Sequence, residues 1–463
     1  MRGAVRGIEV TRRGAIGALA GGALWFVLAG PGRERKRRDG RVVLDYWEKW
    51  TGQEGAAMEA IVDAFNQSQS RVWVRYLATA GVSEKAMISI AGGASPDLVG
   101  LYGHDVPQFA ESGAITALDE LPGGESLSPE RYAGAFRGFV RHADRDGRER
   151  AWGVVSSGGT LALYWNKARF AEAGLPGPPR TAEELDTAHD RLTEVRGGRI
   201  VRAGFVDREP GWWSWVFGPI FGGRVWDPES WRSELSGEGS VRAYQWVQDR
   251  ATRHGVSPMK QFRSGFGNYD SPRNAFLAGE VAMVLQGPWL ANIIGAYAGE
   301  GFEYGVAPMP ASGSIRDDGA PVGAAEADVV VVPRGVKDPG ACVEFLRFCQ
   351  ERENLERLSL AHFKNSPLAE SSEGFRSLHP NRGLAAFDAV AKSPRSFTTP
   401  RTRAWPEIKR EMDAMMDPVC EGNEPASAVL ARVDRRVQAV LDRQTARRRR
   451  RGWPVPGGAG GPA

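Results

Sequence analysis

The sequence predicts an α/β fold in which helices flank largely parallel sheets. Three observations support this prediction: the chain has 463 residues, 42% of them are hydrophobic, and strand-like runs alternate with helical stripes from residue 42 onward. A chain of this length and apolar content can form two or three lobes with cores of their own. Alternation of strands and helices is typical of parallel sheets, because each helix returns the chain to the same edge of the sheet.

The alternation is clearest in the first third of the chain. Residues 42–47 form a short apolar run that predicts a buried strand. The helix that follows carries one apolar stripe at the spacing i, i+3, i+4, i+7, formed by Met58, Ile61, Val62 and Phe65. We expect a second strand over 72–77, a helix over 84–90, and a third strand over 96–102.

The remainder continues in the same style. A β-rich run covers 152–165, and a capping box at Thr181 and Glu184 predicts the start of a helix. Residues 276–285 read as a helix end followed by a strand, and the chain beyond Pro333 reads as mostly helical.

The charge is distributed unevenly along the chain. The net charge is +4, but residues 1–41 and residues 432–463 carry +7 each, which leaves −10 for the body between them. A nucleic-acid-binding protein concentrates positive charge on its folded face, so this distribution argues against that class. We expect 442–463, which is basic and rich in Gly and Pro, to be a disordered tail.

The first 41 residues resemble an export signal followed by a basic linker. Paired Arg12 and Arg13 precede an apolar run over 15–29, as in a twin-arginine signal, and this run is short for a membrane span. We therefore expect a periplasmic or cell-envelope protein, tethered to the membrane if the segment stays uncleaved. The alternative is an intracellular protein with an apolar N-terminal helix.

Motifs for nucleotide, metal and nucleophile chemistry are absent from the sequence. It contains no phosphate-binding glycine loop, no G-x-S-x-G and no H-E-x-x-H, and its six histidines do not pair at metal-ligand spacing. We therefore expect no cofactor and no metal. Because carboxylates are plentiful, a pair of them that acts on glycans stays possible.

Aromatic residues stand at several predicted strand ends. Trp47 with Glu48, and Tyr102 with His104 and Asp105, each follow a strand, and ligands of open α/β sheets bind beyond the carboxyl ends of strands. Flat indoles can cover the apolar face of a sugar, and one such contact contributes about 2.5 kcal/mol before ordering costs. The alternative is that these tryptophans pack in the core or between lobes.

Taken in order, several motifs resemble the extracellular solute-binding proteins of ABC importers, in the maltodextrin-binding-protein-like branch. The motifs are AGG at 91–93, PD at 96–97, FAESG at 109–113, YWNK at 164–167, AGL at 173–175, FLAGEVAM at 276–283, QGPW at 286–289 and YGVAP at 304–308. They span roughly residues 42–440.

The resemblance implies a two-lobed clamp whose chain crosses between the lobes three times. We expect the crossings near 153–156, 277–283 and 325–331. The corresponding lobes are 42–154 with 282–328 and 155–281 with 329–441. A ligand held between the lobes stabilises the closed form, which then docks on a membrane permease.

The resemblance also implies ligand contacts at positions that match the family's motifs. They are Trp47, Glu48, Tyr102, His104, Asp105, Ser156, Ser157, Trp212, Trp213, Trp289, Arg403 and Trp405. Of these, only the two strand-end groups and Trp289 also emerge from the strand-end rule alone.

The resulting prediction is a monomeric, non-catalytic protein that captures a mono- or oligosaccharide for an ABC importer. The main alternative is an envelope enzyme that acts on glycans through an unassigned carboxylate pair. A clamp for phosphate, polyamines or metal ions lacks the clustered ligands that such charges demand.

Overall fold

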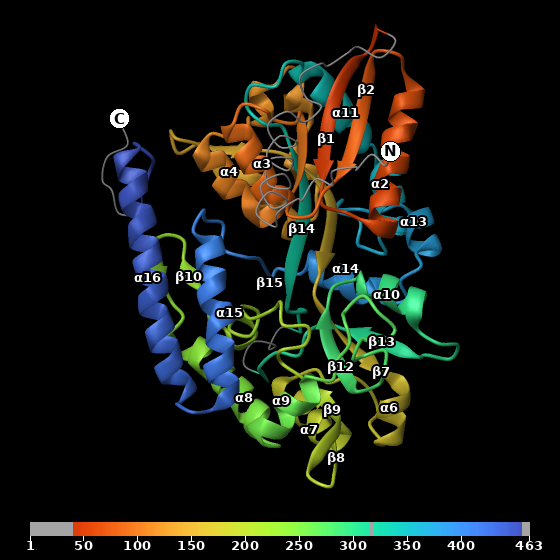
Figure 1. The fold of residues 1–463 in the computed structure, drawn as a ribbon, viewed down its shortest axis with the longest axis vertical. Coiled ribbons are helices and arrows are strands. Elements are labelled where there is room, and N and C mark those ends of the chain that lie inside the picture. Colours follow the sequence, from red (N-terminus) through yellow and green to blue (C-terminus); the bar gives the residue numbers. More distant parts are fainter. Residues whose placement is uncertain (1–39, 314–318, 456–463) are drawn as a thin grey trace, which may run out of the picture.

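The computed structural model describes residues 40–313 and 319–455, which form two lobes, each built on one sheet (Figure 1). The first sheet has the strand order β15-β14-β3-β1-β2, with β6 also paired to β14. Its strands are β1 (Val42–Glu48), β2 (Val72–Ala78), β3 (Leu98–Tyr102), β6 (Val154–Thr160), β14 (Gly323–Val331) and β15 (Ser396–Phe397).

The first lobe confirms the predicted strand–helix alternation. Strand β1 pairs in parallel with both β2 and β3. The apolar stripe of Met58, Ile61, Val62 and Phe65 is at most 2% exposed, because it packs α2 onto the sheet. The helices of this lobe include α2 (Gly52–Ser68), α3 (Val82–Ala91), α4 (Val106–Ser112), α11 (Pro339–Cys349) and α12 (Arg352–Ala361).

The second lobe has the sheet order β13-β7-β12-β9-β8. Its strands are β7 (Ala162–Asn166), β8 (Glu194–Arg196), β9 (Arg199–Phe205), β12 (Val281–Gln286) and β13 (Tyr304–Ala307). Only β9 and β12 pair in parallel, whereas β7–β12, β7–β13 and β8–β9 are antiparallel. The expectation of a mostly parallel sheet is therefore wrong for this lobe, because apolar runs do not encode strand direction.

Seven helices of the described chain flank the second sheet or extend from it: α6 (Lys167–Glu172), α7 (Ala182–Leu192), α8 (Glu238–Thr252), α9 (Val256–Arg263), α10 (Leu290–Tyr297), α15 (Trp405–Glu421) and α16 (Ala426–Arg450). The predicted cap of α7 is confirmed, since the Thr181 side chain accepts a hydrogen bond from the backbone N–H of Glu184. Short elements complete the described fold: α5 (Gly134–Arg137), α13 (Glu373–Leu378), α14 (Leu384–Lys392), and the hairpins β4 (Arg141–Ala143)–β5 (Glu149–Ala151) and β10 (Trp226–Asp227)–β11 (Arg232–Ser233).

The chain crosses between the lobes three times, but not where the motifs placed all the crossings. The first crossing joins β6 to β7, the second is β14 itself, and the third runs through α14 and β15 to α15. The predicted crossing at 277–283 is wrong, because β12 pairs with β7 and β9 inside the second sheet.

The predicted lobe boundaries change accordingly. Residues 282–313 belong to the second lobe, and α11 and α12 belong to the first, where Phe345 packs on Phe65 with ring centroids 5.1 Å apart. The sequence of an apolar helix or strand does not specify which sheet it packs on or joins. The order of the motifs therefore gave the wrong lobe for these segments.

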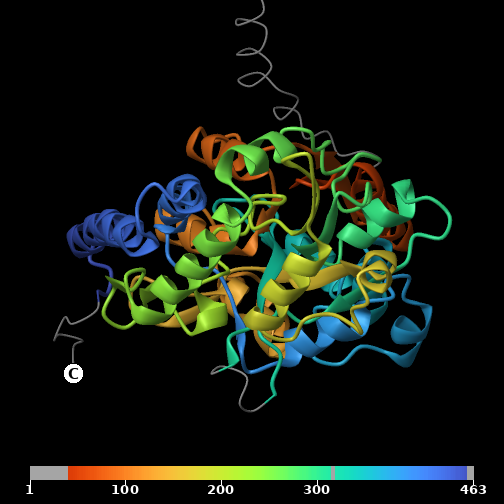
Figure 2. The same ribbon diagram turned by 90° about the horizontal axis from the view of Figure 1, so that it is seen from below.

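The C-terminal region is helical where disorder was expected. Helix α16 runs without a break to Arg450, so the predicted tail is wrong for 442–450. Val429, Val433, Val437 and Leu441 are at most 3% exposed and pack α16 beside α15 and α8. Figure 2 shows α15 and α16 side by side at one edge of the molecule.

The N-terminal predictions concern residues outside the described part of the chain. The signal-like segment and its paired arginines lie before residue 40. Within 40–313 and 319–455, no helix combines the length and the apolar character that a membrane crossing requires.

Candidate functional site

Two buried lysines meet one aspartate on the crossing strand β14. The Nζ atom of Lys49 lies 3.2 Å from Oδ1 of Asp328, and Nζ of Lys364 lies 3.3 Å from Oδ2 of the same side chain. Lys49 follows β1 directly, and Lys364 follows α12, so both come from the first lobe. Both lysine side chains are 7% exposed.

Each lysine has a second carboxylate partner. Lys49 Nζ lies 3.0 Å from Glu48 Oε1, and Lys364 Nζ lies 3.2 Å from Glu54 Oε1. Burial opposes charge on all these groups, but the mutual attraction outweighs it: the pKa of each lysine is raised, and the pKa of Asp328 is lowered to about 2. Both lysines and Asp328 are therefore charged at neutral pH.

Aromatic rings flank both ammonium groups. Lys49 Nζ lies 4.8 Å from the ring centroid of Trp50 and 4.9 Å from that of Tyr102. Lys364 Nζ lies 5.5 Å from Trp50 and 5.8 Å from Trp289, which is on the second lobe. These separations fall in the range of cation–π attraction, so Lys364 links the two lobes.

The aromatic series continues on the second lobe. Trp289 is 6.1 Å from Trp213, Trp213 is 6.0 Å from Trp212, and Trp212 is 4.8 Å from Tyr269, measured between ring centroids. We call the whole set the interlobe cluster: Lys49, Trp50, Glu54, Tyr102, Asp328 and Lys364 of the first lobe, with Trp212, Trp213, Tyr269 and Trp289 of the second. The rings at its ends are open to solvent, since Tyr102 is 45% and Trp212 41% exposed.

Some hydrogen-bond donors in and beside the cluster are buried without a partner among the described residues. They include Nε1 of Trp213 and Nε2 of Gln286. The Oε1 atom of Gln286 accepts from Trp289 Nε1 at 3.0 Å, which places its amide against the same indole. Buried donors usually find an acceptor, so this part of the cluster can receive one from a ligand.

Four predicted residues come together in the interlobe cluster: Tyr102, Trp212, Trp213 and Trp289. His104 lies next to it, stacked on Tyr102 with ring centroids 5.4 Å apart and planes at 3°.

The surroundings of His104 favour its charged form. Its Nδ1 is 3.8 Å from Glu326 Oε2, and its Nε2 is 3.8 Å from Asp105 Oδ1. Burial opposes the charge, but Glu326 and Asp105 outweigh it and raise the pKa of His104. Asp105 itself also accepts a hydrogen bond from Ser83.

Other predicted contacts are buried or half-buried within the first lobe. Glu48 is 0% exposed, lies against Gly100, and accepts from the Tyr46 hydroxyl at 2.6 Å, so it supports Lys49 from beneath. Trp47 is half-buried against the core of the first lobe. Ser156 and Ser157 are 3% and 0% exposed within β6.

Trp405 requires a correction. Its indole is 1% exposed and meets Trp215 edge-on at 5.9 Å inside the core of the second lobe, so it is a packing residue here. It opens α15, and the amphipathic packing of that helix turns the ring inward. Arg403 precedes the same helix and is half-buried, with Nη1 lacking a partner among the described residues.

Sequence reasoning missed several members of the cluster. Lys49 and Trp50 directly follow the first strand, and Glu54 lies in the first turn of the helix after it, so the strand-end rule applied to them as well as to Glu48. Asp328 is a charge within an apolar strand, which is itself a sign of a special role. Lys364 carries no local signal.

One group of potential metal ligands occurs among the described residues, formed by His189, Asp190 and His254 within 4.8 Å of one another. The backbone N–H of Phe205 donates to Nδ1 of His189 at 3.1 Å. Burial and Arg250 lower the pKa of His189 to about 3, so the ring is neutral and its proton sits on Nε2. That tautomer offers no lone pair to a metal.

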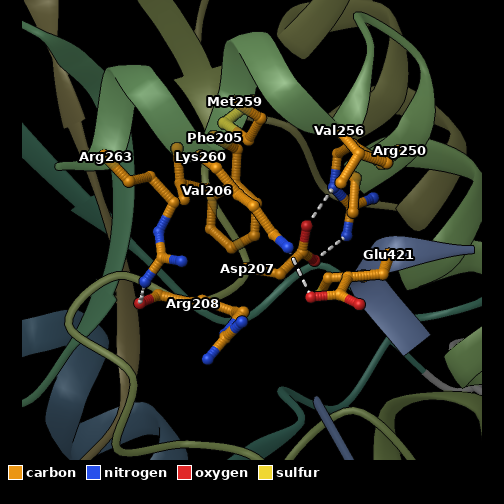
Figure 3. Close-up of a pocket in the computed structure, with 12 residues that line it drawn as sticks. Phe205, Val206, Asp207, Arg208, Arg250, Val256, Met259, Lys260, Arg263 and Glu421 are labelled. Carbon is orange, nitrogen blue, oxygen red and sulfur yellow. Dashed lines mark hydrogen bonds and ion pairs between the residues drawn. The ribbon is translucent and has the colours of Figure 1, made fainter. Parts of the chain in front are cut away.

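A separate pocket of about 40 Å³ lies on the second lobe between β9, α8, α9 and α15. Figure 3 shows that ion pairs close its walls: Asp207 bonds to Arg250, and Lys260 Nζ lies 2.5 Å from Glu421 Oε1. None of the residues predicted to bind a ligand lines this pocket.

Residues 49–356 match the family described as bacterial extracellular solute-binding protein. The chain belongs to this family. The two lobes joined by three crossings, with aromatic and charged side chains meeting between them, are the arrangement expected of such a solute-binding protein. The members to which it is similar are binding proteins.

Three similar proteins illustrate the relationship. The solute-binding protein is 20% identical to a maltotriose-binding protein of Pyrococcus abyssi over 60% of this chain, and it spans only 55% of that relative's length. It is 23% identical to the sn-glycerol-3-phosphate-binding periplasmic protein UgpB of Yersinia pseudotuberculosis, over 86% of this chain and 92% of the relative. The solved structure described as CpMnBP1 with mannotriose bound superposes with a TM-score of 0.73 at 21% identity, covering 87% of this chain and all of the other.

Proposed function

We propose that this protein captures a saccharide between its two lobes without chemical change and delivers it to the permease of an ABC importer. The observation that carries the proposal is the interlobe cluster, in which aromatic faces of both lobes meet around paired charges. Two of the similar proteins bind maltotriose and mannotriose by their descriptions, which supports a saccharide ligand.

The cluster supplies both kinds of contact that a sugar needs. The exposed faces of Trp212 and Tyr102 can cover the apolar C–H face of a ring. The unpartnered donors of Trp213 and Gln286 can bond hydroxyl oxygens at its edge. Two or three stacking contacts with these hydrogen bonds give a binding free energy on the order of −8 kcal/mol, which is micromolar affinity.

The protonation states favour capture over catalysis. Glycoside hydrolysis requires one carboxylic acid that still holds its proton near neutral pH. Asp328 in the cluster has a pKa lowered to about 2, so it stays an anion at neutral pH. Glu54 in the cluster and Glu48 beside it each pair with a lysine, so all three carboxylates are engaged in positioning the lysines.

The proposal includes export. The apolar segment over 15–29 with its paired arginines would direct the protein to the periplasm or cell envelope, where a solute-binding protein meets its ligand. Whether this segment is cut or kept as an anchor is read directly from the N-terminal sequence of protein recovered from the envelope.

The test is a thermal-shift screen with saccharides, followed by calorimetry of the best ligand with wild type and Trp289→Ala. A ligand at 100 times its Kd stabilises the protein by about 2.7 kcal/mol, which such a screen detects. We expect at least tenfold weaker binding by the variant, and no effect of Trp73→Ala, which removes a half-buried indole at the opposite end of the parallel strands. Equal affinity of Trp289→Ala and wild type, or product released from the saccharide, contradicts the proposal.

A further inference from the structure

We propose that Asp328 sets the charge selectivity of the interlobe cluster, so that the site accepts neutral saccharides and rejects phosphorylated or carboxylated ones. This inference rests on the proposed saccharide-binding function. It addresses a property that the relatives leave open, because they include both a maltotriose-binding protein and a sn-glycerol-3-phosphate-binding protein.

The charges of the site do not favour an anion. The two ammonium groups of Lys49 and Lys364 face three carboxylates, Glu48, Glu54 and Asp328, so this group carries one net negative charge. Asp328 is the only one of the three that contacts both lysines. Glu326, two residues before it on β14, adds a further carboxylate beside His104.

The hydrogen bonds of Lys49 are fully used. Its ammonium group has three N–H donors, and it faces three acceptors: Glu48 Oε1 at 3.0 Å, the Leu101 carbonyl at 3.2 Å and Asp328 Oδ1 at 3.2 Å. Lys364 faces two carboxylate oxygens, at 3.2 and 3.3 Å, which leaves one N–H. An entering phosphate would therefore gain one ammonium N–H at most from this pair.

A neutral hydroxyl suits the same surroundings. One N–H of Lys364 and the buried donors of Trp213 and Gln286 can each bond an uncharged oxygen. A phosphate or carboxylate in the same place would lose its hydration and face a net negative group, which disfavours the charged ligand. Asp328 thus occupies two lysines that could otherwise bind an anion and holds their ammonium groups beside the aromatic rings.

The experiment compares neutral and anionic probes on wild type and on charge variants. Calorimetry with mannotriose, maltotriose, glucose 6-phosphate and sn-glycerol 3-phosphate gives the ratio of affinities in wild type, which we expect to favour a neutral sugar at least 100-fold. Asp328→Asn removes one negative charge and leaves a single side-chain oxygen that can accept from the two lysines. We expect this variant to bind a phosphorylated probe more tightly, so that the ratio of neutral-sugar affinity to phosphorylated-probe affinity falls at least tenfold.

Glu54→Gln provides a second route that leaves the crossing strand untouched. Glu54 is 25% exposed on α2, and its substitution by Gln removes the negative charge beside Lys364 without changing the partners of Lys49. Its effect on the affinity ratio should have the same sign and be smaller. Glu303→Gln, at an exposed ion pair with Lys167, is the matched control and should leave the ratio unchanged.

The outcomes separate this inference from the function on which it rests. Tight binding of a phosphorylated probe by wild type, or an unchanged ratio in folded Asp328→Asn and Glu54→Gln, overturns the role of Asp328 and leaves solute capture intact. Failure of wild type to bind any saccharide, neutral or charged, overturns both.

Discussion

The junction between α16 and the first lobe provides a quantitative test of how the lobes are held together. Helix α16 packs on the second lobe along most of its length, and in Figure 1 its last turns rise beside α4 of the first lobe. There the guanidinium of Arg448 lies 2.5 Å from Glu111 Oε1, and His142 Nε2 lies 3.1 Å from the same oxygen. All three side chains are at most 9% exposed.

Substituting Arg448 by Met keeps an apolar stem against Trp231 and Trp453 and removes the charge. Glu111 is then buried with His142 as its remaining partner. Removing one member of a buried ion pair typically costs about 3–5 kcal/mol, because the other charge stays desolvated. At about 2–4 °C per kcal/mol for a large domain, the melting temperature should fall by roughly 6–20 °C.

Differential scanning calorimetry and denaturant titration measure this loss. Arg450→Met, on an exposed arginine of the same helix, is the control and should change stability by less than about 0.5 kcal/mol. The double variant Glu111→Gln/Arg448→Met should recover much of the loss, since it removes the orphaned charge. Equal stability of Arg448→Met and Arg450→Met would refute the reasoning.

The pH dependence of this junction has a definite sign. Burial works against the charge of Glu111, but His142 and Arg448 outweigh it and lower the pKa of its carboxyl. The resulting stabilisation is present above the usual value of 4.5 and is lost as the pH falls through the lower folded value. The penalty of Arg448→Met should therefore shrink in acid, where Glu111 can take up a proton.

The remaining predictions concern acid stability and the core. The pKa of Asp328 falls from 3.8 to about 2 in the fold, so its ionisation stabilises the folded state by about 2 kcal/mol. This stabilisation is present above about pH 4 and is lost as the pH falls from about 4 to about 2. Urea titrations at pH 5 and pH 2.5 should show most of this loss of unfolding free energy in wild type and not in Asp328→Asn. Trp405→Ala should destabilise the fold by about 3–5 kcal/mol, because it opens a cavity beside Trp215. The saccharide affinity of the folded variant, measured by calorimetry below its melting transition, should change less than threefold. A large loss of affinity in this variant with little loss of stability would instead return Trp405 to the binding site.

Local patterns in the sequence were reliable where the physics is local. The apolar stripe of α2 and the Thr181 cap of α7 follow from side-chain spacing within one helix, and both are present in the structure. The strand-end rule also predicted that Trp289 faces the gap between the lobes; β12 ends just before it and its indole lies 5.8 Å from Lys364 of the first lobe, while its contact with a ligand stays a prediction.

Errors arose where a segment had to choose between distant partners. The motifs predicted a crossing at 277–283, yet β12 lies in the middle of the second sheet. Trp405 was grouped with the ligand contacts, yet Trp215 and the packing of α15 draw it into the core. An apolar strand or an aromatic side chain has several suitable neighbours, and its sequence does not state which one it meets.

By itself, the sequence determined the α/β class and the family, because periodicity, caps and ordered motifs are properties of neighbouring residues. The tertiary structure alone decided which lobe each late segment joins and that Lys49 and Lys364, 315 positions apart, share one aspartate. The physical reason is that a charge is tolerated inside a protein only with a partner. Here the chain topology supplies the partner, because it brings the ends of β1 and α12, with Lys49 and Lys364, next to Asp328 on β14.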